Sequence, residues 1–258
     1  MHEARVQHIA SGYLPNVANL CRVVVSDPDL GSGLDDRRLA RAQQECLAME
    51  VVVEEGVWRP EHAEGEAARG GIGLLIIDGL LVRRVGAEGR YGAELLGPGD
   101  LLRPWQHDGE DQTLPFETSF RVIDRLQLAV LDLKATARLA PYPEVVGALV
   151  GRAMQRARHF AVNMAIAHYP RIDRRVLLFL WHIADRWGRV TPEGIRIPMR
   201  LTHTLLADLV AARRPSVTTA LAQLEHEHHL SRHDNIIVLH GEPPADFEVV
   251  ASALRNGQ

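Results

Sequence analysis

The chain has 258 residues, of which 46% are hydrophobic and 24% are charged, and its formal net charge is −4 at pH 7. This length suits two domains, and the balance of apolar and charged residues excludes a disordered or fibrous protein. No apolar run approaches the roughly 18–20 residues of a membrane span, and the first residues lack a signal peptide. We therefore expect a cytoplasmic protein with no membrane partner.

The first 50 residues are expected to be mainly helical, with Asp35 capping a helix over Arg37–Met49. A β-rich texture follows, in which Asp78-Gly79 is a hairpin signal. Further turns are expected at 86–89 and 97–100. The β-prone runs are 51–53, 72–77, 80–82, 119–123 and 126–133. Many short strands between Gly and Pro turns predict a sandwich or jelly roll.

The pattern changes at residue 141. Apolar residues recur with steps of four and three, which predicts one long helix over 141–170 that Pro170 ends. Its narrow stripe comprises Val146, Val150, Ala153, Ala157, Phe160 and Met164. A narrow stripe on a long helix between two domains predicts a homodimer formed along this helix. The alternative is that the stripe packs only against the chain's own β domain.

The remaining segment, 171–258, opens with a helix over 171–187 and is predicted to contain a winged helix-turn-helix. Two short helices occupy 201–224, with Thr202 as a cap, a turn at Ala211-Ala212 and Pro215 in the first turn of the second helix. Strands over 195–198 and 235–239 can pair as a wing.

The second of these helices has the division of faces that a major-groove helix needs. Val217, Leu221 and Leu224 can face inward, and the opposite face is polar. We predict that Arg213 contacts a phosphate and that Arg214 reads a base, guanine by preference. Further DNA contacts are predicted from Thr202, His203, Ser216, Thr218 and Thr219. The alternatives are solvated side chains and, for Thr202, capping alone.

The distribution of charge supports this location. Residues 1–140 contain 15 Lys and Arg against 22 Asp and Glu, whereas residues 171–240 contain 10 against 7. DNA affinity depends on the local neutralisation of phosphates, so the positive late segment is where double-stranded DNA would bind.

These motifs resemble those of the Crp/Fnr family of bacterial transcription regulators, over residues 35–240. The specific part of the match is Leu201-Thr202, the run 206–210, Arg213-Arg214, Ser216-Val217, Ala220-Leu221 and Leu224-Glu225. In the β-rich part, the segments 78–80 and 96–100 precede a long helix in the expected order.

The resemblance implies an α+β protein with three parts. Residues 1–140 would form a cyclic-nucleotide-binding-like β jelly roll with N-terminal helices, 141–170 a dimerisation helix, and 171–258 a winged helix-turn-helix. It further implies a homodimer that binds a palindromic site, an effector bound in the jelly roll, and contacts with RNA polymerase.

Two positions depart from the pattern of the family's nucleotide-binding members. After Gly99-Asp100, Arg103 stands where those members have Gly, and Pro104 stands where they have the Glu that holds the ribose. We therefore expect that cyclic AMP does not control this protein. Pro215 replaces a Glu that reads cytosine in many relatives, so the DNA site should differ from theirs.

A different effector can still be accommodated, and we expect its pocket to include Arg83, Glu94, Arg103 and Trp105. We predict no metal and no cofactor, because the chain has only Cys21 and Cys46 and an iron–sulfur site needs about four ligands. Two alternatives belong to other classes of function. One is a cupin-like metal enzyme that carries a winged helix, and the other is a winged helix that binds proteins rather than DNA.

Overall fold

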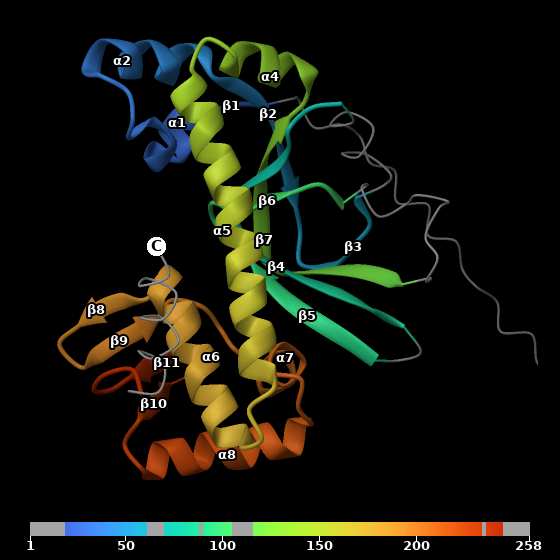
Figure 1. Cartoon of the computed structure of the whole chain (residues 1–258), viewed down its shortest axis with the longest axis vertical. Coiled ribbons are helices and arrows are strands. Elements are labelled where there is room, and N and C mark those ends of the chain that lie inside the picture. Colours follow the sequence, from blue (N-terminus) through green and yellow to red (C-terminus); the bar gives the residue numbers. More distant parts are fainter. Residues whose placement is uncertain (1–18, 61–69, 88–89, 105–115, 234–235, 245–258) are drawn as a thin grey trace, which may run out of the picture.

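The computed structural model describes residues 19–60, 70–87, 90–104, 116–233 and 236–244. A β barrel with short helices at one end lies beside the long helix α5 (Pro143–Ala167), and α5 leads to a C-terminal head (Figure 1). The α+β architecture predicted from the sequence is confirmed in this arrangement.

The N-terminal part combines one short strand with three helical segments. They are β1 (Leu20–Arg22), α1 (Val23–Ser26), the 3₁₀ helix η1 (Pro28–Gly31) and α2 (Asp36–Glu45). Asp35 caps α2 as predicted, since its Oδ1 accepts from Arg38 N at 2.8 Å. The predicted extension to Met49 is wrong. Residues 47–49 belong to a strand whose pairing with β1 and with the barrel overrides the helical pattern.

Within the described residues, seven antiparallel strands pair in the order β1-β2-β7-β4-β5, with β3 on β7 and β6 on β4. The barrel strands are β2 (Leu47–Val53), β3 (Gly56–Trp58), β4 (Gly73–Ala87), β5 (Arg90–Leu96), β6 (Leu101–Leu102) and β7 (Glu117–Leu131). Leu74, Leu81 and Leu128, from β4 and β7, lie in the barrel core and are fully buried.

The predicted hairpin at Asp78-Gly79 is wrong, because β4 continues through it with β7 alongside. The register of β4 on β7 shifts at this point, which marks an irregularity of the bulge type. Gly79 has φ +91°, and a Cβ there would lie 2.2 Å from the carbonyl oxygen of Arg125. The Asp-Gly pair therefore bends one long strand and does not separate two.

The strand-like run 126–133 also ends earlier than predicted. Asp132 accepts from Ala135 N at 2.7 Å and starts α4 (Leu133–Leu139). Leu133 therefore lies on a helix, because the local cap decides its conformation.

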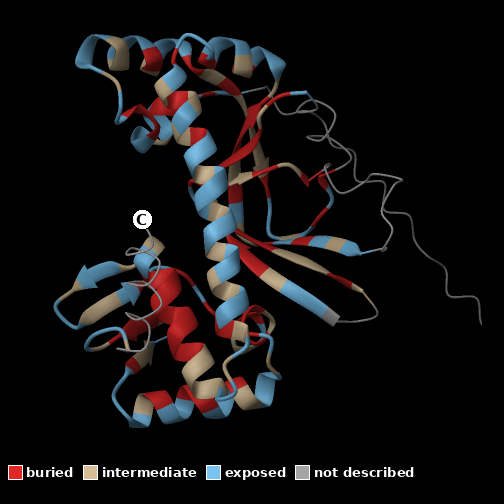
Figure 2. Ribbon diagram, viewed as in Figure 1, coloured by how far each residue is buried: buried red, intermediate tan, exposed pale blue. Residues whose placement is uncertain are grey.

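Helix α5 begins two residues after the predicted start and ends three before the predicted end. Its stripe at 145, 149, 152, 156, 159, 163 and 166 is buried or half-buried against the rest of the chain. The neighbouring stripe, offset by one residue, points outward over most of its length: Ala153 and Ala157 are exposed, and so are Val150, Phe160 and Met164. Val146, also predicted for the dimer interface, is instead half-buried and packs against the N-terminal core of its own chain. Most of the α5 surface in view is accordingly coloured as exposed in Figure 2.

The head contains α6 (Ile172–Trp187), α7 (His203–Leu209) and α8 (Arg214–His226). Its strands are β8 (Arg189–Thr191), β9 (Gly194–Ile197), β10 (Leu230–His233) and β11 (Ile236–Leu239). The predicted wing is confirmed, since Ile237 of β11 pairs with Ile197 of β9, and β10 and β8 widen it to the order β10-β11-β9-β8.

The head and the barrel share a continuous apolar core. Leu80, Val82 and Leu95 of the barrel belong to the same buried cluster as the inner faces of α6, α7 and α8. Across the described part of the chain, no helix has the length and apolar character needed to cross a bilayer.

Candidate DNA-binding surface and effector cavity

Helix α8 has the two faces predicted for it. Val217, Leu221 and Leu224 are buried at 0%, 0% and 2% exposure. On the other face Arg213, Arg214, Thr218 and Thr219 are exposed and Ser216 is half-buried. Arg213 occupies the cap position and Pro215 lies in the first turn. The first turn of α8 therefore presents two guanidinium groups and several hydroxyl groups to solvent.

The turn before α8 is held by a side chain from α6. Arg175 Nη1 donates to the carbonyl oxygens of Val210 and Ala211 at 3.1 and 3.0 Å. Ala211 has φ +50°, in the left-handed region that residues other than glycine seldom occupy. These bonds satisfy carbonyl groups at the end of α7 and fix the angle between α7 and α8.

A hydrogen-bonded chain joins α7, α8 and the wing. Arg232 Nη1 lies 2.8 Å from His203 Nε2, and His203 Nδ1 lies 2.9 Å from Thr218 Oγ1. Because a guanidinium can only donate, Nε2 accepts and Nδ1 carries the proton. Burial and the charges of Arg232 and Arg214 lower the pKa of His203, which agrees with this neutral form. Both ring nitrogens of His203 are thus engaged within the head.

The predicted DNA-contacting hydroxyl groups also have partners within the head. Thr218 Oγ1 donates to the carbonyl oxygen of Arg214 at 3.1 Å, and Thr219 Oγ1 donates to that of Pro215 at 3.2 Å. Thr202 caps α7, accepting from Leu205 N at 3.2 Å. Each hydroxyl keeps an unused lone pair, so Thr218 and Thr219 could accept from a base amine without losing these bonds.

A cavity of about 300 Å³ lies between the barrel and α5. It contains three of the four residues predicted for an effector pocket, namely Arg83, Glu94 and Arg103; Trp105 lies outside the described residues. Other lining residues are Leu102, Pro104, Phe120, Ala153, Arg156, Ala157 and Phe160. Ala153, Arg156, Ala157 and Phe160 belong to α5, so the cavity adjoins the exposed stripe of that helix.

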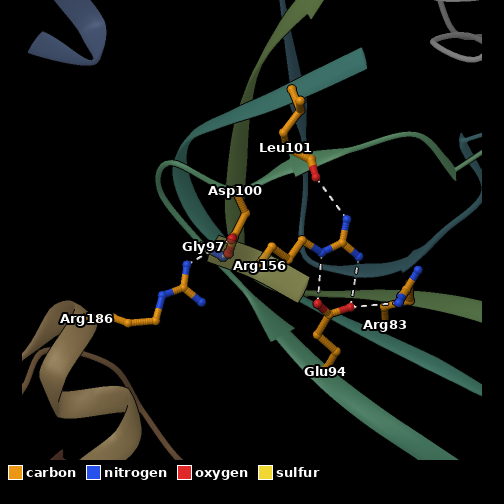
Figure 3. Close-up of polar contacts among 7 residues, drawn as sticks. All are labelled: Arg83, Glu94, Gly97, Asp100, Leu101, Arg156 and Arg186. Carbon is orange, nitrogen blue, oxygen red and sulfur yellow. Dashed lines mark hydrogen bonds and ion pairs between the residues drawn. The ribbon is translucent and has the colours of Figure 1, made fainter. Parts of the chain in front are cut away.

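Glu94 is the centre of an ion-pair network in this cavity (Figure 3). Arg156 Nε and Nη2 bind its two carboxylate oxygens at 2.8 and 2.9 Å, and Arg83 Nη2 lies 2.9 Å from Oε2. Arg156 also donates to Leu101 O at 2.9 Å. Burial alone would raise the pKa of Glu94, but Arg156 and Arg83 outweigh it and lower that pKa. The carboxylate is therefore ionised, and it pairs with two arginines.

A second buried ion pair connects the barrel to the head. Arg186 Nη2 of α6 binds Asp100 Oδ1 at 2.8 Å, and Asp100 Oδ2 accepts from Gly97 N (Figure 3). The ring of Trp187 lies against Gly97, where a Cβ would come within 2.9 Å of it. The turn at 97–100 is therefore locked to the end of α6.

Sequence reasoning missed Arg156, which makes the closest contacts to Glu94. Its signal was available: Arg152 and Arg156 lie four residues apart on α5, hence on one face of the helix. Arg152 Nη2 contacts Asp27 Oδ1 at 3.1 Å on that same face. This pair of arginines therefore indicates which side of α5 packs against acidic groups of its own chain.

The described residues contain no group of three or more His, Cys, Asp or Glu side chains that could hold a metal ion. Cys21 and Cys46 are both buried, and burial raises the pKa of each thiol to about 11. Both thiols are therefore protonated and poorly nucleophilic near neutral pH.

Comparison with known proteins identifies the head. Residues 174–242 match the Crp-like helix-turn-helix domain family. A putative HTH-type transcriptional regulator, ycf28 of Porphyra purpurea, is 27% identical over 85 residues, which is 33% of this chain and 35% of the relative. The matched part thus spans about a third of that protein.

Solved structures share the fold of about three quarters of the chain. FixK2 from Bradyrhizobium japonicum is 17% identical, with a TM-score of 0.54 and coverage of 75% of this chain and 93% of that one. The c-di-GMP-responsive regulator CLP of Xanthomonas campestris is 18% identical, with a TM-score of 0.53 and coverage of 81% and 100%. A cyclic nucleotide-binding domain-containing protein from Listeria monocytogenes has a TM-score of 0.57 at 15% identity and coverage of 73% and 87%.

The head is therefore a Crp-like helix-turn-helix domain, of the kind that DNA-binding transcription regulators carry, and most of the chain has the fold of the solved structures above. The family resemblance drawn from the sequence is confirmed, as is the cyclic-nucleotide-binding-like fold of the β domain.

Proposed function

We propose that the protein works as a cytoplasmic homodimer that reads a palindromic DNA site through α8 and regulates transcription without catalysing a reaction. The observation that carries this proposal is the exposed pair Arg213 and Arg214 at the start of a helix whose opposite face is buried. Arg213 would position the head on a phosphate, and Arg214 would read guanine. Thr202, Ser216, Thr218 and Thr219 would add contacts, and His203 would hold Thr218 in place.

The exposed stripe of α5 supports the homodimer. Val150, Phe160 and Met164 are 56%, 42% and 51% exposed. An apolar stripe of this length on one helix fits a second copy of the same helix, because a two-fold axis brings identical stripes together. Contact with RNA polymerase is a further part of the proposal, on the strength of the family resemblance.

The experiment for DNA reading starts with selection of a preferred duplex from a random library by the purified protein. Replacing Arg214 by Ala should weaken binding to that duplex by about 1–3 kcal/mol and relax the preference at one position in each half-site. Arg189→Ala, which removes another exposed arginine of the head, is the matched control. An unchanged sequence preference in Arg214→Ala would reject the role of Arg214.

Salt dependence distinguishes this function from a winged helix that binds only proteins. A DNA-binding head should lose affinity steeply as salt rises, because phosphate contacts release counterions. Failure to retain any duplex at low salt would favour the protein-binding alternative.

For the cavity, we propose a small anionic effector other than cyclic AMP. Arg83 and Arg156 outnumber Glu94, and the side chains of Phe120 and Leu102 supply apolar wall. Pro104 offers neither a carboxylate nor a backbone N–H for a ribose. Titration calorimetry with cyclic AMP should show no tight binding, and submicromolar affinity would overturn this part of the proposal.

A further inference from the structure

The head is packed against its own barrel on the side that carries Thr202. Helix α7 lies beside β5, and Leu205 belongs to the apolar cluster that includes Val82 and Leu95 of the barrel. At the edge of this contact, Arg84 of β4 forms an ion pair with Asp208 of α7. Three residues of one face of α7 and its cap, at 202, 205 and 208, are thus directed toward the barrel.

A crevice of about 590 Å³ separates the two surfaces beyond the ion pair. Thr202 and Thr204 line it from the head, and Glu55, Gly56 and Arg121 line it from the barrel. A DNA duplex, whose major groove alone is about 12 Å wide, cannot enter such a space.

We propose that this packing is an autoinhibited state, in which the Arg84–Asp208 ion pair latches the head to the barrel and withholds the α7 side of the head from DNA. The inference rests on the proposed function, since it assumes that the head binds a duplex. Arg213 and Arg214 stay exposed in this state, so the latch weakens DNA binding and does not abolish it. Separation of α7 from β5 is then part of tight DNA binding.

The latch can be tested by reversing one charge. Arg84→Glu places a second carboxylate opposite Asp208 and should weaken the attachment of α7 to the barrel. We expect affinity for the selected duplex to rise about twofold to fivefold, the range that an exposed ion pair of this kind can account for. Without a latch, the same variant should bind DNA more weakly than the wild type, because it makes the protein more negative. Arg125→Glu is the matched control, since Arg125 pairs with Glu54 on the barrel surface and carries the same charge change.

A charge swap completes the test. The double variant Arg84→Glu with Asp208→Arg restores the pair in reverse and keeps the net charge of the wild type, so its affinity should return toward the wild-type value. The latch would be overturned if Arg84→Glu bound the duplex no more tightly than the wild type. It would also be overturned if the change in affinity of the double variant equalled the sum of the changes caused by Arg84→Glu and Asp208→Arg alone.

A second experiment keeps α7 attached to the barrel by a covalent cross-link. Cysteines introduced at 84 and 208 and joined by a short bifunctional maleimide should lower duplex affinity relative to the same protein before cross-linking. Cysteines at 54 and 125, joined in the same way within the barrel, should leave it unchanged. Cross-linked protein that binds as well as the uncross-linked form would show that the packed arrangement is competent for DNA. If neither the wild type nor Arg84→Glu selects any duplex, the proposed function itself fails and the latch with it.

Discussion

Glu94→Gln should destabilise the protein strongly, because it removes the carboxylate that pairs with both Arg83 and Arg156. The Glu94 side chain is 7% exposed, and those of Arg156 and Arg83 are 16% and 17% exposed. Removing one partner of a buried ion pair costs about 3–5 kcal/mol, since the other charge stays buried without compensation. Gln can still accept one hydrogen bond, and the arginines retain some solvent, so we expect about 3 kcal/mol.

The assay is urea unfolding followed by tryptophan fluorescence at pH 7. Glu117→Gln is the control, because Glu117 is exposed and only accepts from Tyr91 on the surface; its effect should stay within about 0.5 kcal/mol. Combining Glu94→Gln with Arg156→Gln removes the uncompensated charge as well, and the double variant should be more stable than the sum of the two single effects.

The pH dependence of the free energy of unfolding tests independently whether Glu94 stabilises the fold as a carboxylate. The pKa of Glu94 is lowered from its ordinary 4.5. Its stabilising effect is therefore complete above pH 4.5 and is lost as the pH falls through the lower folded value. A loss below about 1 kcal/mol for Glu94→Gln at pH 7, or strictly additive effects with Arg156→Gln, would refute this account of the network.

Three further predictions concern the dimer, the histidines and a helix cap. Phe160→Glu should weaken self-association in sedimentation experiments, whereas Gln155→Glu, at another exposed position of α5, should not; an intact Phe160→Glu dimer would count against the stripe. Burial holds the pKa of His182 at about 4, below the ordinary 6.5. The unfolded chain then binds more protons below pH 6.5, so the free energy of unfolding should fall by about 2 kcal/mol from pH 7 to pH 5 on account of His182. His182→Phe should remove that part of the fall, and an unchanged slope would contradict the assignment. Asp35→Ala should cost about 1 kcal/mol in the same urea assay, through loss of the α2 cap.

Local signals in the sequence were enough where local chemistry decides the structure. Thr202 and Asp35 cap the helices they were expected to cap. The buried positions of α8 follow from spacing alone, because a helix with one buried face repeats every three or four residues. The helices of the head and the pairing of β9 with β11 could therefore be predicted, whereas β8 and β10 were missed.

Long-range pairing explains the predictions that were wrong. Asp78-Gly79 has the composition of a hairpin turn, but β7 pairs with β4 on both sides of it, and the glycine is used for a bulge. Residues 47–49 fit a helical pattern, yet pairing with β1 and β7 makes them a strand. Neither partner strand is visible from the local sequence, so the composition of these segments could not decide between the alternatives.

Helix α5 is a third example of what the local sequence leaves open. The spacing of its apolar residues predicts a stripe but does not show which surface covers that stripe. Two stripes, offset by one residue, repeat with the same steps of four and three along this helix. The more apolar of them is exposed, and the one with Arg152, Arg156 and His159 packs against the chain. Charged residues face inward because Asp27 and Glu94 lie there to neutralise the arginines.

The three ion pairs between the barrel and the later helices differ in how easily they can open. Glu94–Arg156 and Asp100–Arg186 are largely buried, with carboxylate side chains 7% and 3% exposed, whereas both partners of Arg84–Asp208 are about one-third exposed. Separating a buried pair leaves uncompensated charges and costs several kcal/mol, but an exposed pair contributes roughly 1 kcal/mol or less. Of these three pairs, Arg84–Asp208 is thus the least costly to separate. The head would then pivot about the Asp100–Arg186 contact while α6 stays attached to the turn at 97–100. An effector that competed for Arg156 would act first on α5. Arg156 donates to the carbonyl oxygen of Leu101 in β6, one residue after Asp100, which binds Arg186 of the head. The influence of the effector on the head would therefore have to pass through the turn at 97–100.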